Sequence, residues 1–283
     1  RLHEIYTTGQ STLTNGEPWY QTYVDYALEN GIVQAGDFTS YTAKATRGQM
    51  AYLFSRALPA TVLPSIHNVQ TLPDVTGSTK YSQEIFSLYN AGVLTGSDVF
   101  GTFKPNDNII RAEAAAILTR VALPEQRKTV VLMKQVQWGN AKIAVPQSAG
   151  AGVTENGYFS VSSQQDLCVA VANAATDKNF KGYNITKLFT PDSMSQMIAT
   201  AFSTNDVQFK NMGTKTVTFG ALKAYRTTGS ALFNEGNYNC VVYTYISGDT
   251  MSMILLMAYE NDIALQNMAN GLMVGGVTAS PQF

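Results

Sequence analysis

The chain has 283 residues, of which 45% are hydrophobic and 14% are charged, and its formal net charge is −1. This length is enough for two or more domains with buried cores, and the balanced charge argues against a surface that binds nucleic acid or anionic membranes. No apolar run approaches the roughly 18–20 residues of a membrane-spanning helix, so we expect no membrane insertion.

The first half of the chain contains the same unit of sequence twice. Residues 46–56 recur as residues 110–120 at a constant offset of 64, and residues 20–32 recur as residues 81–93 at an offset of 61. The loop between the two blocks is therefore three residues shorter in the first copy. A repeat of roughly 60 residues predicts stacked modules, which typically bind other molecules rather than catalyse reactions.

The first copy reads as a helix, a loop and a second helix. Its first helix follows Pro18 and ends at Gly31, and its apolar residues have the 3–4 spacing of one buried face. Those residues are Tyr20, Tyr23, Val24, Ala27 and Leu28. The second helix begins at Thr46, and Gln49 completes a predicted capping box.

The second copy predicts helices at about residues 84–90 and 111–121. Ile110 stands where the first copy has a threonine, so the capping hydroxyl is missing. We expect Asn108 to cap this helix instead, and Glu113 to cap its own helix from the first turn.

These motifs resemble the S-layer homology repeat of bacterial cell-surface proteins, over about residues 1–124. The motifs are Trp19-Tyr20, Ala27-Leu28-Glu29-Asn30-Gly31-Ile32 and Thr46-Arg47-Gly48-Gln49 in the first copy, and Leu72-Pro73-Asp74-Val75, Ala91-Gly92-Val93-Leu94-Thr95-Gly96, Phe103-Lys104-Pro105 and Ile110-Arg111-Ala112-Glu113 in the second. The resemblance implies an all-α, pseudo-threefold bundle of three repeats. It divides the chain into the tail of a truncated repeat (1–15), two full repeats (16–64 and 65–127) and a further domain (128–283). An upstream first repeat, now lost, is the expected source of the tail.

The resemblance also implies a function: non-covalent anchoring of an exported protein to the cell wall of a Gram-positive bacterium. The partner would be an anionic secondary wall polysaccharide, often carrying a pyruvylated sugar. Guanidinium groups hold carboxylates through two parallel hydrogen bonds, and aromatic faces pack against sugar rings. The expected contacts are Arg47 and Arg111, followed by Trp19, Tyr81, Lys44, Lys104 and Asp74.

Each of these residues also has a structural interpretation. The two arginines could pair with acidic groups of adjacent repeats, Trp19 could fill the core between repeats, and Asp74 could cap a turn. The first copy lacks the Phe-x-Pro motif, so a binding groove that uses this loop would be altered. No cofactor is implied. His3 and His67 lie far apart without a ligand pattern around them, so we expect no metal site.

From about residue 128 onward, the sequence pattern changes from one typical of helices to one mostly typical of strands. The pattern predicts an α+β domain with an antiparallel sheet and helices on one face, including a hairpin around Gly213, a turn at Gly248-Asp249 and helices that begin at Thr190 and Asp262. The order of elements faintly resembles the PsbP/Mog1-like sandwich. Several aromatic and basic residues could line a binding face or simply pack in the sheet: Tyr183, Tyr225, Arg226, Tyr243 and Tyr245.

Two other functions stay open at this point. One is a wall-anchored enzyme with its catalytic site in the C-terminal domain, where the candidate carboxylates are scattered: Asp166, Asp206, Glu235 and Glu260. Cys168 and Cys240 are expected to be buried small side chains or a disulfide, and no histidine lies in that half to activate a catalytic thiol. The other alternative is self-association, in which the repeats serve only as an assembly surface between copies. The main prediction is therefore a surface-located binding protein rather than an enzyme.

Overall fold

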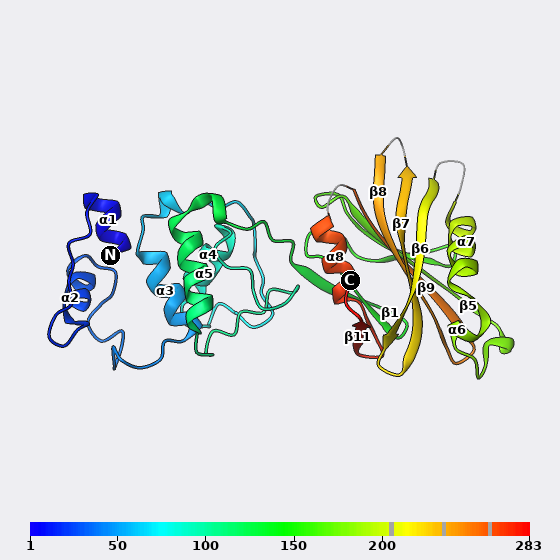
Figure 1. Cartoon of the computed structure of the whole chain (residues 1–283), viewed down its shortest axis with the longest axis horizontal. Coiled ribbons are helices and arrows are strands. Elements are labelled where there is room, and N and C mark those ends of the chain that lie inside the picture. The colour runs from blue at the N-terminus through cyan, green and yellow to red at the C-terminus, as the bar shows by residue number, and fades with distance from the viewer. Residues whose placement is uncertain (204–206, 234–235, 260–261) are drawn as a thin grey trace. The chain divides into compact units, whose positions relative to one another are not determined.

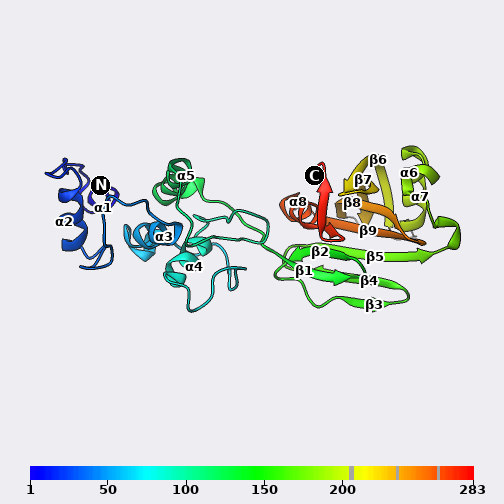
Figure 2. The same ribbon diagram turned by 90° about the horizontal axis from the view of Figure 1, so that it is seen from below.

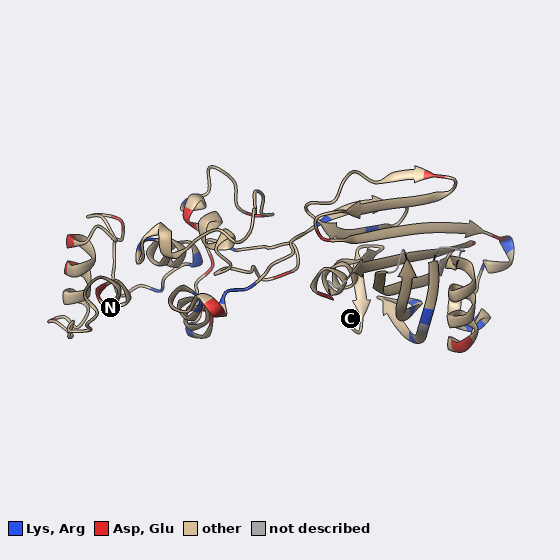
Figure 3. Ribbon diagram, turned by 90° about the horizontal axis from the view of Figure 1, so that it is seen from above, with Lys and Arg blue, Asp and Glu red and all other residues tan. Residues whose placement is uncertain are grey.

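The computed structural model describes residues 1–203, 207–233, 236–259 and 262–283. The chain forms two compact units, Arg1–Val130 and Val131–Phe283. The first is helical and the second is built on a sheet (Figures 1 and 2). Acidic and basic residues are scattered over both units (Figure 3), in keeping with the net charge of −1.

The N-terminal unit consists of helices joined by long loops. The α-helices are α1 (Leu2–Thr8), α2 (Gln21–Glu29), α3 (Arg47–Arg56), α4 (Ser82–Asn90) and α5 (Arg111–Ala122), with short 3₁₀ turns at Ala60–Val62 and Pro124–Gln126. Thus α2 and α3 belong to the first repeat, and α4 and α5 to the second. The helix–loop–helix reading of each copy is confirmed. The pseudo-threefold arrangement of a complete bundle remains a prediction.

The helix boundaries follow from local chemistry that the two repeats share. Thr46 accepts a hydrogen bond from the Gln49 backbone N–H, and the Gln49 side chain accepts one from the Thr46 N–H, so the predicted capping box is present. After α2 and α4 the chain turns through Gly31 and Gly92, with φ of 66° and 70°. Glycine adopts this left-handed conformation without the steric cost of a Cβ atom, and so it ends both helices.

The first helices of the two repeats differ in burial, although their sequences correspond. In α4, Ile85, Leu88 and Tyr89 are fully buried. Helix α3 packs against α4, with the rings of Tyr52 and Tyr81 4.8 Å apart, and Tyr89 contacts Phe103 and donates to the Gly101 carbonyl. In α2 no residue is buried. The apolar face predicted for the first repeat is thus only half-covered, and its prediction as a buried face was wrong.

Over its described residues, the C-terminal unit consists of one antiparallel sheet and three α-helices. In chain order its elements are β1 (Met133–Trp138), β2 (Ala141–Pro146), β3 (Val153–Glu155), β4 (Tyr158–Ser163), β5 (Cys168–Thr176), α6 (Ile185–Leu188), α7 (Pro191–Phe202), β6 (Val207–Phe219), β7 (Leu222–Phe233), β8 (Gly236–Ser247), β9 (Thr250–Tyr259), α8 (Asp262–Gly271), β10 (Met273–Val274) and β11 (Val277–Ser280), with a 3₁₀ turn at Lys178–Phe180. The strand order is β1-β2-β10-β11-β6-β7-β8-β9-β5-β4-β3. The antiparallel sheet predicted from the sequence is confirmed.

Helices cover both faces of this sheet, whereas the sequence predicted helices on one face. Side chains of β8 alternate between the faces. Val242 packs with Met194 and Ile198 of α7, while the Tyr243 hydroxyl donates to the carbonyl of Ala269 in α8 on the opposite face. Because residues 240–246 are all buried, β8 needs a cover on each side.

A second correction concerns Gly213. The sequence predicted a hairpin there, but β6 continues through this residue, which pairs with Thr228, and the register shifts between Lys210 and Gly213. A glycine inside a strand commonly marks such a bulge rather than a turn. The predicted start of that hairpin at Asp206 lies outside the described residues. The predicted turn at Gly248-Asp249 is confirmed.

Candidate functional site

One arginine in each repeat ties the second helix to the turn that follows the first helix. Arg56 donates from Nε to the carbonyl of Ile32 (3.0 Å) and from Nη2 to that of Gly31 (2.9 Å). Arg120 stands at the corresponding position and donates from Nη1 to the carbonyl of Val93 (3.1 Å). These bonds place a guanidinium group at the same point of each repeat.

In the second repeat this arginine lines a small pocket of about 150 Å³. One wall is α5, and another is the turn after α4. Arg47, from α3 of the first repeat, forms part of the lining. The lining residues are Arg47, Leu94, Thr95, Gly96, Glu113, Ala116, Ile117 and Arg120. Two arginines and one glutamate therefore border a space large enough for a small polar group.

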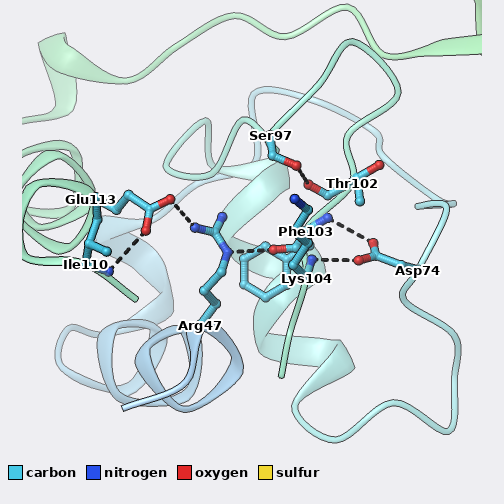
Figure 4. Close-up of polar contacts among 8 residues, drawn as sticks. All are labelled: Arg47, Asp74, Ser97, Thr102, Phe103, Lys104, Ile110 and Glu113. Atoms are coloured by element: carbon cyan, nitrogen blue, oxygen red, sulfur yellow. Dashed lines mark hydrogen bonds and ion pairs between the residues drawn. The ribbon is translucent and has the colours of Figure 1, made fainter. Parts of the chain in front are cut away.

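Arg47 is 9% exposed and is fixed by three contacts (Figure 4). Its Nε donates to the carbonyl of Phe103 (2.6 Å), its Nη1 pairs with Glu113 (2.7 Å), and the guanidinium lies over the Phe103 ring at 5.1 Å. Arg47 therefore forms the ion pair with an acidic group of the adjacent repeat, Glu113, that was considered from the sequence. Among the described residues, no hydrogen bond uses the remaining Nη2 group, so Arg47 keeps donor capacity toward the pocket.

Glu113 serves two roles at once. Its Oε1 pairs with Arg47, and its Oε2 accepts a hydrogen bond from the backbone N–H of Ile110 at the start of α5 (3.1 Å; Figure 4). The predicted capping role of Glu113 is confirmed. The predicted cap from Asn108 was wrong, because Ile110 is the N-cap residue of α5 and its side chain makes no capping hydrogen bond. The backbone of Asn108 forms an isolated bridge to Thr46 of the first repeat. The carboxylate is held in a fixed direction by both contacts.

Asp74 and Lys104 meet at the loop that carries Phe103. The Asp74 carboxylate accepts hydrogen bonds from the backbone N–H groups of Phe103 (2.9 Å) and Lys104 (2.6 Å; Figure 4), so it acts as the turn cap considered from the sequence. Lys104 has a φ of 59°, and its side chain is exposed. Because Asp74 holds the N–H of Phe103 and Arg47 holds its carbonyl, the two residues together fix this loop.

Trp19 and Lys44 lie on one groove of about 380 Å³ in the first repeat. Trp19 is 60% exposed and therefore does not fill the core between repeats. We call this space the first-repeat groove. Its lining is mostly apolar and consists of Trp19, Tyr20, Tyr23, Val24, Ala27, Val33, Phe38, Thr39, Ser40, Tyr41, Ala43, Lys44, Ala45, Gln49 and Leu53.

The remaining two predicted contacts lie elsewhere. Tyr81 packs between the repeats against Tyr52, and Arg111 is exposed and lines neither the pocket nor the first-repeat groove. Sequence reasoning missed Arg120. Its correspondence to Arg56 at the offset of 64 was the available signal.

The predicted binding residues of the C-terminal unit are divided between the two faces of the sheet. Tyr225 lies with Val242 on the face that α7 covers, while Tyr243 and Tyr245 contact Phe219 on the other, and Tyr183 is exposed. Arg226 pairs with Tyr243 across β7 and β8 and so shares the face of Tyr243 and Tyr245, but both tyrosines are fully buried, which favours the packing alternative. Three of the four candidate carboxylates, Asp206, Glu235 and Glu260, lie outside the described residues, and Asp166 accepts hydrogen bonds from Ser148 and Ser163.

The two cysteines are buried and unbonded to each other. Cys168 pairs with Ala258 of β9, and Cys240 pairs with the adjacent residue of the same strand, Met257. Successive strand residues point to opposite faces, so the two thiols lie on opposite sides of the sheet and the disulfide alternative was wrong. Burial raises the pKa of both thiols to about 12. Within the described ranges, no three potential metal ligands cluster, and no helix is long and apolar enough to span a membrane.

Comparison with known families identifies the second repeat, since residues 71–115 match the model of the S-layer homology domain. These residues form an S-layer homology domain. The match includes Asp74, Phe103 and Glu113. A domain of this family indicates non-covalent attachment to the cell wall in general, and a location at the cell surface. No curated protein matches the chain.

Solved structures similar to this chain share little sequence with it. Cyanobacterial PsbP (CyanoP) from Synechocystis is 11% identical, with a TM-score of 0.40, over 52% of this chain and 94% of its own. A protein from Bacteroides thetaiotaomicron is 8% identical, with a TM-score of 0.31, over 48% and 45%. LpqN of Mycobacterium tuberculosis, involved in cell envelope biogenesis, is 16% identical, with a TM-score of 0.30, over 54% and 93%. TM-scores below 0.5 do not establish that these structures share a fold with this chain.

Proposed function

We propose that the S-layer homology repeats attach an exported protein to the cell wall by binding an anionic, pyruvylated secondary polysaccharide, and that the C-terminal unit is displayed from the wall. We propose a binding rather than a catalytic role. The observation that carries this proposal is the pocket bordered by Arg47, Arg120 and Glu113, of whose eight lining residues four lie in the matched range 71–115.

The chemistry of the pocket suits a carboxylate attached to a sugar. Arg47 and Arg120 are each oriented by hydrogen bonds to backbone carbonyls, so their remaining N–H groups are pre-organised for an anion. A volume of about 150 Å³ admits a small charged substituent but not a whole sugar ring. We therefore propose that the pyruvyl carboxylate enters the pocket and that the sugar ring stays outside.

The other predicted contact residues do not all belong to this pocket. Asp74 supports the site through the Phe103 loop, while Lys104 and Arg111 are exposed and available to the chain of the polysaccharide. Trp19 and Lys44 line the first-repeat groove, away from this pocket, and Tyr81 packs between the repeats. Their role as sugar contacts remains a prediction.

The test is co-sedimentation with purified Gram-positive wall sacculi, with and without their secondary polysaccharide. Arg47→Lys and Arg120→Lys keep the positive charge but remove the planar fork of donors, and should weaken pelleting about tenfold. Arg226→Lys in the C-terminal unit makes the same chemical change outside the repeats and is the matched control. Circular dichroism must show that each variant is folded. Pelleting that does not depend on the polysaccharide, or that both lysine variants leave intact, would contradict the proposal.

A further inference from the structure

The two repeats differ at the residue one helical turn before the arginine of the second helix. In α5, Ala116 precedes Arg120 by four positions, and in α3, Tyr52 precedes Arg56 by four. Residues four apart on a helix share one face, so the side chain at this position lies next to the guanidinium group. Because the two arginines bond to corresponding backbone carbonyls, the two positions can be compared directly.

In the second repeat this position leaves open space. Ala116 and Arg120 both line the pocket of about 150 Å³ that is described above, and the turn after α4 forms another part of its lining. The side chain of Ala116 is exposed. A cavity of about 150 Å³ holds one benzene molecule, so a single aromatic ring would occupy most of this pocket. The open space next to Arg120 therefore depends on a small side chain at residue 116.

In the first repeat an aromatic ring fills the corresponding space. The Arg56 guanidinium lies 4.9 Å from the centroid of the Tyr52 ring. The Tyr52 hydroxyl donates to Oδ2 of Asp37 (2.5 Å), and the same oxygen accepts a hydrogen bond from the N–H of Gln34 (2.7 Å). At the offset of 61, Gln34 corresponds to Thr95 of the pocket lining. The tyrosine thus extends from the arginine to the turn, across the space that is open in the second repeat.

Arg56 also lies near a carboxylate of its own repeat. The hydrogen bond from Tyr52 holds the pKa of Asp37 below its ordinary value, and the positive charge of Arg56 adds to this effect. Tyr52 is 7% exposed and stacks on Tyr81 with ring centroids 4.8 Å apart, so its ring is held in place. Arg56 therefore faces a buried ring and a negative charge, where Arg120 faces an open pocket.

We propose that Ala116 is the residue that lets an anionic substituent reach Arg120, and that Tyr52 closes the corresponding site of the first repeat. The ligand of the pocket is then a carboxylate on a compact substituent, and the size of residue 116 limits what can enter. This inference rests on the proposed function and deepens it. It assigns the ligand to one of two similar arginines and names the side chain that makes the difference.

The first experiment adds matched variants to the co-sedimentation with wall sacculi. Ala116→Tyr gives α5 the residue that α3 has, and it should weaken pelleting by at least about tenfold, the value of one charge-assisted hydrogen bond. Ala115→Tyr adds the same ring at an exposed neighbouring residue that does not line the pocket, and is the control. Arg56→Lys should leave pelleting unchanged, whereas Arg120→Lys should weaken it. Circular dichroism must show that each variant is folded.

The outcomes separate this inference from the proposed function. If folded Ala116→Tyr pellets as the wild-type chain does while Arg47→Lys and Arg120→Lys pellet weakly, the inference is overturned and the proposed function stands. Equal weakening by Arg56→Lys and Arg120→Lys would also overturn the inference. A wild-type chain that does not pellet would contradict the proposed function, and the second experiment would still decide the inference.

The second experiment needs no polysaccharide. Pyruvate, which carries a free carboxylate, is titrated into the isotope-labelled chain while NMR follows the backbone amide signals. The signal of Thr95 should shift saturably, and that of Gln34, whose N–H is held by Asp37, should not. Ala116→Tyr should abolish the shift at Thr95, and Ala115→Tyr should preserve it. Saturable shifts at both residues or at neither, or a shift at Thr95 that survives Ala116→Tyr, would overturn the proposal.

Discussion

The glycines that end α2 and α4 provide a matched pair for measuring what tertiary contact adds to a local requirement. Gly31 and Gly92 occupy corresponding positions, and both have left-handed backbone with φ of 66° and 70°. Around Gly31 there is open space where a Cβ atom would be. At Gly92 a Cβ would lie 2.7 Å from the carbonyl oxygen of Lys128 and 2.7 Å from the Cδ1 atom of Ile66.

The expected costs follow from these surroundings. Left-handed backbone costs a non-glycine residue about 1–2 kcal/mol, so Gly31→Ala should lower the free energy of unfolding by about 1 kcal/mol. Gly92→Ala carries the same cost and must also displace the Lys128 backbone, whose N–H donates to the Gly92 carbonyl at 2.9 Å. Losing that bond costs about 1 kcal/mol and the overpacking about 1–3 kcal/mol. The total for Gly92→Ala is then about 4 kcal/mol.

Urea unfolding, followed by the far-ultraviolet circular dichroism of the helices, measures the free energy of unfolding of both variants. We expect Gly92→Ala to lose about 3 kcal/mol more than Gly31→Ala. Equal losses would refute the reasoning, because they would show that the segment at Lys128 moves aside without cost.

Three further predictions test other contacts. Asp74→Ala should lower the free energy of unfolding by about 3 kcal/mol, because it removes two charge-assisted hydrogen bonds and leaves the buried N–H of Phe103 unpaired. Asp25→Ala, at an exposed residue of α2, should lower it by under about 0.5 kcal/mol in the same urea titration. The hydrogen bond from Tyr52 holds the pKa of Asp37 below its ordinary 3.8. The stability that this bond adds is therefore complete above pH 3.8 and is lost as the pH falls through the lower pKa of the folded state. Tyr52→Phe should reduce this acid-dependent loss when the free energy of unfolding is measured at a series of pH values, and an unchanged profile would contradict the role of this bond. The two buried thiols, with pKa values of about 12, should not react with a thiol reagent at pH 8 until urea unfolds the C-terminal unit, and rapid labelling of the native chain would contradict their burial.

The sequence determined the features that depend on neighbours along the chain. The offsets of 61 and 64 revealed two repeats, and short-range patterns placed the capping box at Thr46, the glycine turn after α2 and the strands of the antiparallel sheet. The capping box and the glycine turn rest on hydrogen bonds and backbone geometry within a few residues, and the strands were recognised from the alternation of their side chains. The motifs were also sufficient to identify the S-layer homology domain that the family match confirms.

Tertiary structure decided which residues face each other across long separations. Arg47 and Glu113 are 66 positions apart, and only the packing of α3 against the second repeat brings them together. Helix α4 is buried whereas the corresponding face of α2 is only half-buried, although both helices show similar apolar spacing. Spacing along one helix shows which side chains share a face. Whether another element covers that face depends on the rest of the fold, and here that difference separates an interior surface from an open groove.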